Sequence, residues 1–157
     1  MFRMDPSKIE YNQAMDRLTF RPGHRNRSRC DYDDYYVNGK RLAEILNIAD
    51  FIPPFGWLES NLESEFANML LLQAPSNLRT GRIPLFVCPE CVDYGCGVGT
   101  CNVQLSAGIV TWSHFGWESS YQEDLHQEAI DKSLVLRFDE TLYKALFASK
   151  TNLHYRR

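Results

Sequence analysis

The chain has 157 residues, of which 44% are apolar, 24% charged and 13% aromatic, and its net charge is −3. No apolar run reaches the roughly 18 to 20 residues of a membrane span, and the N-terminus lacks the apolar stretch of a secretory signal. A chain of this length buries roughly 70% of its unfolded surface, so a core forms without disulfides or metal. We therefore expect one soluble domain, residues 1–157, in the cytoplasm, where its five cysteines stay as free or metal-bound thiols.

The N-terminal part combines a basic segment with short elements. Residues 15–20 predict a weak first strand, and residues 21–29 predict a loop, so residues 1–30 are interpreted as a peripheral segment. The basic side chains of that loop are Arg21, Arg25, Arg27 and Arg29, with His24. Three acidic residues of opposite charge follow directly, namely Asp31, Asp33 and Asp34. Residues 35–37 then predict a strand, 38–39 a turn and 40–48 a short helix.

The clearest predicted helix covers residues 60–73. Ser60 and Glu63 have the spacing of a capping box, and the apolar residues recur at helical intervals. Residues 84–87 predict a strand that leads into a cysteine-rich turn. Residues 100–106 and 109–115 predict a hairpin about Ala107 and Gly108.

That hairpin has a definite expected register. A two-residue turn pairs Cys101 with His114 and Val103 with Trp112. After an acidic loop, residues 134–138 predict a strand, and Asp139 opens a last helix with Leu142 and Leu146 on its inner face. The elements together predict an α+β fold, a single domain in which two or three helices pack against an antiparallel sheet.

Four cysteines follow the spacing C-x2-C-x4-C-x4-C, namely Cys88, Cys91, Cys96 and Cys101. This is the spacing of a zinc knuckle with cysteine in the usual histidine place, and four thiolates form a closed structural zinc site. In the alternative interpretation the thiols carry no metal, because Cys101 alternates with apolar residues on a predicted strand and behaves there as a small hydrophobe.

Two catalytic interpretations of the same cysteines remain open. A Cys101–His114 pair would make an activated thiolate, although no third residue is evident to orient the histidine. Cys88 and Cys91 also have the C-x-x-C spacing of thiol–disulfide exchangers. Such enzymes place the first cysteine at the start of a helix, whereas glycines and a strand follow here.

Part of the chain resembles a family of uncharacterised bacterial proteins. The shared segments are Pro84 to Cys91 (PLFVCPEC), Asp93, Gly95-Cys96-Gly97, Trp112-Ser113 and Phe115-Gly116, with Asp34 to Gly39 upstream and Phe138-Asp139 and Tyr143 downstream. The resemblance covers roughly residues 31 to 147, and it implies a fold and a cysteine motif but no reaction. Family members carry cysteines matching Cys88, Cys91 and Cys96, with an apolar residue at Cys101 and an acid at His114; some are labelled oxidoreductases.

The leading functional hypothesis is a non-enzymatic, cytoplasmic protein-binding protein. A bacterial immunity protein that covers a basic toxin domain fits the acidic composition. The predicted partner-binding residues are the acids Glu118, Glu123 and Asp124, with the aromatic residues Trp117 and Tyr121. The alternative is a zinc- or thiol-dependent oxidoreductase using Cys88, Cys91 and Cys96. A third hypothesis, RNA binding by the arginines of residues 21–29, is disfavoured because no aromatic side chains interleave them.

Overall fold

The computed structural model describes residues 15–27, 29–121 and 124–151, and for residues 120, 121 and 124–126 it describes the backbone alone. It confirms the predicted α+β class. The described residues form three α-helices and two antiparallel sheets. The described α-helices are α2 (Leu42–Ile45), α3 (Ser60–Leu70) and α4 (Glu140–Thr151), and a short 3-10 turn, η1, spans Tyr94–Cys96.

The smaller sheet consists of β1 (Leu18–Arg25), β2 (Cys30–Val37) and β3 (Lys40–Arg41). Residues 21–25 of the basic segment therefore belong to β1, and the prediction of a loop over residues 21–29 is wrong for these five residues. Two of its arginines are held by neighbours: Arg21 lies 4.5 Å above the ring of Tyr36, and Arg25 lies 3.6 Å from Glu90. The β1–β2 register sets Arg21 opposite Asp34 and His24 opposite Asp31, so charge complementarity accompanies this pairing.

The larger sheet has the order β4–β5–β6–β7, and β8 also pairs with β6. Its strands are β4 (Ile83–Phe86), β5 (Val98–Ser106), β6 (Ile109–Tyr121), β7 (Asp124–Asp131) and β8 (Leu136–Asp139). The turn at Ala107 and Gly108 has positive φ at both residues, which matches the right-handed twist of a hairpin. The predicted pairing of Val103 with Trp112 is confirmed, whereas the predicted acidic loop is β7.

An irregularity in β5 corrects the predicted pairing of Cys101 with His114. The register shifts between Thr100 and Asn102, so Cys101 pairs with Ile83 of β4 instead. Cys101 is fully buried and His114 is exposed. The structure therefore excludes the predicted Cys–His pair.

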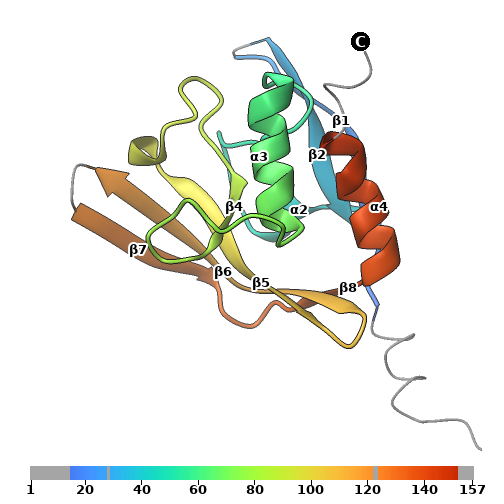
Figure 1. Cartoon of the computed structure of the whole chain (residues 1–157). Helices are drawn as coiled ribbons and strands as arrows, with labels where there is room; N and C mark the ends of the chain where they lie inside the picture. Colours follow the sequence, from blue (N-terminus) through green and yellow to red (C-terminus); the bar gives the residue numbers. More distant parts are fainter. Residues whose placement is uncertain (1–14, 28, 122–123, 152–157) are drawn as a thin grey trace, which may run out of the picture.

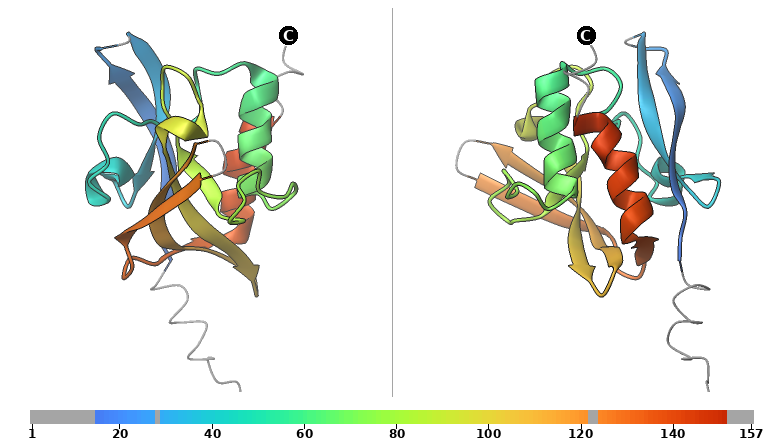
Figure 2. Two further views of the ribbon diagram at one scale, coloured as in Figure 1. Left: turned by 90° about the vertical axis from the view of Figure 1, so that its left-hand side faces the viewer. Right: turned by 45° about the vertical axis from the view of Figure 1, so that its right-hand side comes forward.

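The two long helices lie side by side, and the β1–β2 hairpin lies next to α4 (Figures 1 and 2). The larger sheet closes the space between them, and aromatic rings fill this core. Tyr35 from β2 packs edge-on against Phe86 of β4 and Trp112 of β6, with ring centroids 5.5 and 5.8 Å apart. Phe147 of α4 packs against Phe20 of β1. These rings connect all the layers of one core.

Two details of the helices differ from the sequence prediction. Ser60 and Glu63 form no capping box, because the N-cap is Glu59 and Glu63 accepts a 2.5 Å hydrogen bond from the backbone N–H of Gly56. On α4 the buried residues are Tyr143 and Phe147, whereas Leu142 is 69% exposed. The predicted inner face is therefore displaced by one residue. Asp139 does open the helix, since its carboxylate accepts from the N–H of Leu142.

Two buried tyrosines provide a matched test of the core. Among the described residues the buried Tyr35 hydroxyl has no hydrogen-bond partner, whereas the Tyr143 hydroxyl donates to the Leu70 carbonyl and accepts from the Trp112 indole. We expect Tyr35→Phe to raise the free energy of unfolding by about 1 kcal/mol, and Tyr143→Phe to lower it by about 1–2 kcal/mol. Urea unfolding of both variants measures this, and two changes of the same sign would contradict the assignment.

Candidate metal site

Three cysteines come together in the turn between β4 and β5. The sulfur atoms of Cys88, Cys91 and Cys96 all lie within 4.8 Å of one another. Cys88 follows the end of β4, and Cys96 ends η1 directly before β5. The cluster therefore joins the two ends of this connection, where a bound metal ion would act as a crosslink.

Backbone hydrogen bonds hold the cysteine turn in shape. The N–H of Val92 donates to the Cys88 carbonyl at 3.0 Å, and the N–H of Cys96 donates to the Asp93 carbonyl at 3.0 Å. The Asp93 side chain accepts from the N–H of Gly95 at 2.9 Å and so caps η1. The N–H of Asp93 points at the sulfur of Cys91 at 3.4 Å. N–H donors of this kind stabilise negative charge on sulfur.

Glycine is required where the turn passes over an aromatic ring. Gly97 has φ +108°, and a Cβ on it would lie 2.2 Å from the ring of Trp117. Trp117 itself packs edge-on against Phe51, with centroids 4.6 Å apart. The indole therefore supports the turn from below, and no larger residue fits at position 97.

The pKa values of two of the three thiols are shifted in opposite directions. Burial raises the pKa of Cys88, but hydrogen bonds from the N–H groups of Glu90 and Cys91 and from the other two thiols hold its pKa below the usual value. A hydrogen bond with Cys91 raises the pKa of Cys96 to about 12. Cys88, which is half-buried, therefore ionises more readily than the exposed Cys96.

Cys101, the predicted fourth ligand, lies apart from this cluster. Its side chain is fully buried in the core on β5, and burial raises the pKa of its thiol well above the usual value. It does not belong to the group of three sulfurs. In the described part of the chain, the expected group of four cysteines is thus corrected to a group of three that could hold a metal ion. Cys30 lies on β2 with its thiol directed at the Asp31 carbonyl, 3.8 Å away.

The predicted partner-binding residues do not form one acidic surface. Glu118 is 1% exposed, so it is a core residue and the prediction of a surface role for it is wrong. Trp117 is half-buried beneath the cysteine turn. Tyr121 and Asp124 pair across β6 and β7, and the structure describes their backbone alone. Glu123 lies outside the described residues.

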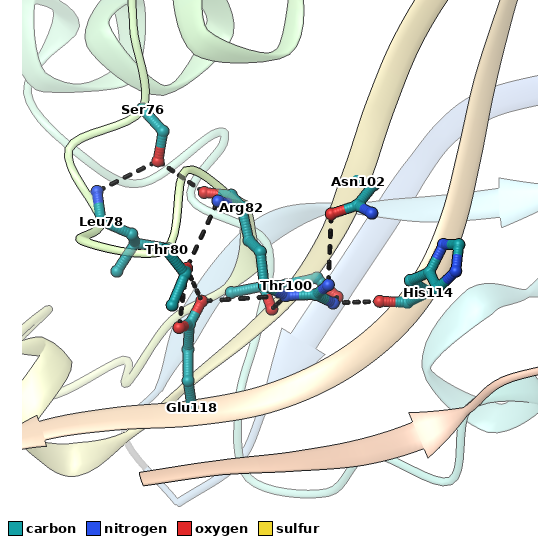
Figure 3. A network of polar contacts seen from close by, with 8 residues as sticks. All are labelled: Ser76, Leu78, Thr80, Arg82, Thr100, Asn102, His114 and Glu118. Atoms are coloured by element: carbon teal, nitrogen blue, oxygen red, sulfur yellow. Dashed lines mark hydrogen bonds and ion pairs between the residues drawn. The ribbon is translucent and has the colours of Figure 1, made fainter. Parts of the chain in front are cut away.

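Glu118 instead belongs to a buried polar network that the sequence did not reveal (Figure 3). The Thr80 hydroxyl donates to both carboxylate oxygens of Glu118, at 3.0 and 2.9 Å, and the Arg82 guanidinium lies 4.0 Å away. Arg82 also donates to Thr100 and Asn102 on β5 and to the carbonyl of His114 on β6. In the sequence, the feature that could have indicated this network is Glu118, the single acid of β6. Its partners Thr80 and Arg82 come from a loop distant in sequence, so the sequence does not reveal the pairing.

No family model matches the chain, and comparison with curated proteins and with solved structures gives no significant match. The resemblance to an uncharacterised bacterial family therefore stays a prediction. Among the described residues, the helices are too short and too polar to cross a lipid bilayer. The site itself provides the functional argument.

Proposed function

We propose that this chain is a cytoplasmic, non-enzymatic protein-binding protein whose cysteine turn is organised by a zinc ion. The observation that carries the proposal is the gathering of Cys88, Cys91 and Cys96, three soft ligands with sulfur atoms within 4.8 Å of one another. Zinc suits such a site because it is redox-inert and accepts thiolates in tetrahedral geometry.

The position of the turn favours an interaction role. Cys91 and Cys96 are exposed, and Cys88 is half-buried. A metal ion held there lies at the surface, next to a loop stiffened by hydrogen bonds and backed by Trp117. Preorganised surface loops bind partners without a large loss of entropy on binding.

The narrower form of the proposal is a bacterial immunity protein that neutralises a basic toxin domain. It rests on the net charge of −3 and on the absence of a recognised catalytic motif from the sequence. Because Glu118 is buried, the contact surface we propose is the cysteine turn and its neighbours, with Glu90 and Asp93 as its exposed acids.

Affinity capture from the native host, with the full chain as bait, tests the binding function. We expect a stoichiometric protein partner that is retained by wild type and by Cys30→Ser and lost with Cys91→Ser. The same partner should bind the purified zinc-loaded chain in isolation. A bait that keeps its zinc and retains no partner would count against the proposal.

A thiol oxidoreductase is the second candidate, and one distance favours it. The sulfur atoms of Cys91 and Cys96 are in hydrogen-bond contact at 3.1 Å, and a disulfide bond of roughly 2.05 Å requires them to approach by about 1 Å. This candidate predicts turnover in a thiol–disulfide exchange assay that falls about 100-fold or more in Cys91→Ser while the melting temperature stays constant. If wild type shows no turnover above free dithiothreitol, the zinc-organised binding function is supported.

A further inference from the structure

We infer that zinc held by Cys88, Cys91 and Cys96 keeps one coordination position open to solvent, and that this position takes a histidine imidazole from a bound protein partner. The inference rests on the proposed function and deepens it, because it names the chemical group by which the partner is recognised. Structural zinc sites are almost always four-coordinate, so three protein ligands leave one position for water or for an outside donor.

The described residues supply no fourth ligand. Within residues 15–27, 29–121 and 124–151, no additional cysteine, carboxylate or imidazole of a described side chain joins the group of three sulfurs. Cys101 is fully buried on β5. Asp93 is already engaged with the N–H of Gly95, and the other carboxylate of the turn, Glu90, pairs with Arg25 at 3.6 Å.

The open position faces outward. Cys88 is half-buried where β4 ends, whereas Cys91 and Cys96 are exposed. The protein therefore covers a bound ion from the side of Cys88 and the Trp117 ring, and leaves the opposite side to solvent. A partner side chain reaches that side without any rearrangement of the core.

Charge selects a neutral donor. Three thiolates around Zn²⁺ carry a net charge of −1, and a fourth thiolate or a carboxylate makes it −2. The exposed Asp93 adds negative charge beside the site, and Glu90, 66% exposed in its side chain, adds charge that Arg25 balances only in part at 3.6 Å. A neutral imidazole keeps the net charge at −1 and gives the Cys₃His set common in structural zinc sites. In the binding step, an imidazole nitrogen lone pair bonds to zinc and one water molecule leaves.

The test uses the full chain loaded with Co²⁺, whose visible spectrum reports its ligands. We expect a spectrum with three sulfur ligands and one oxygen, which shifts saturably on titration with imidazole. Acetate and 2-mercaptoethanol should reach half-maximal binding to the cobalt ion only at concentrations at least about 10-fold higher than imidazole does. In Glu90→Gln, the concentration of imidazole that gives half of the spectral change should stay the same. The concentration of 2-mercaptoethanol needed for half of the change should fall severalfold, so the preference for imidazole over the thiol becomes smaller.

Different failures have different meanings. A cobalt protein with three sulfur ligands that does not respond to imidazole overturns the inference and leaves the metal site intact. A nitrogen ligand present before imidazole is added also overturns it, because the chain's own histidine then fills the position. Failure of cobalt to bind through the three thiols removes the proposed zinc site itself. X-ray absorption of the zinc-loaded chain, alone and with the captured partner, repeats the comparison with the native metal.

Discussion

Replacing Cys91 with serine is expected to lower zinc affinity by more than about 100-fold, because loss even of an outer-shell partner costs 10–100-fold and serine removes a direct ligand. Its hydroxyl stays protonated at neutral pH, so two thiolates remain. Wild type should bind one zinc ion per chain. Competition with a chromophoric chelator gives the affinity, and elemental analysis gives the stoichiometry.

Two other cysteines serve as matched controls for the zinc measurement. Cys101 is buried in the core and Cys30 lies on β2, so Cys101→Ala and Cys30→Ser should each keep one zinc ion per chain. Free zinc at 100 times its dissociation constant should raise the free energy of unfolding of wild type by about 2.7 kcal/mol, and that of Cys91→Ser by far less. Equal zinc binding by wild type and Cys91→Ser would overturn the three-thiolate site.

The sequence predicted the parts of the fold that local patterns determine. The hairpin about Ala107 and Gly108 was correct as far as Asn102, because two residues with positive φ demand this turn and the alternation of its strands sets the register up to the irregularity in β5. Asp139 was correct as the residue that opens α4, since a short carboxylate at that position meets a free N–H.

Tertiary contacts overrode the local pattern elsewhere. The basic segment forms a strand because β2 offers complementary partners, including Asp34 opposite Arg21, which composition alone does not reveal. Glu63 lost its predicted capping role because the loop before α3 brings the N–H of Gly56 to its carboxylate. In both cases the deciding partner comes from another element of the fold.

Only part of the candidate site was predicted from the sequence, because local spacing does not reveal where the chain leaves the turn. Spacing alone suggested Cys88, Cys91 and Cys96, and these three sulfurs are adjacent because one short turn carries them. Cys101 lies beyond Gly97, after the chain has entered β5, and there the strand directs its side chain into the core. The step from turn to strand, which spacing does not encode, separates the fourth cysteine from the others.

Arg82→Met is expected to be the most destabilising substitution outside the aromatic core, at about 3 kcal/mol, because it leaves the Glu118 carboxylate buried without its cation. The guanidinium also hydrogen-bonds Thr100, Asn102 and the His114 carbonyl, which hold the loop before β4 onto β5 and β6. For a chain of this size the melting temperature should fall by about 10 °C.

A second substitution distinguishes charge burial from lost packing. Adding Glu118→Gln to Arg82→Met removes the uncompensated charge while its amide keeps a hydrogen bond with Thr80, so the double variant should recover about 1–2 kcal/mol. Exposed Arg137→Met should change stability by no more than about 0.5 kcal/mol. Zinc affinity should stay constant in every one of these variants, because the network does not contact the three thiols. A double variant less stable than Arg82→Met would show that the guanidinium acts through packing and not through the charge of Glu118.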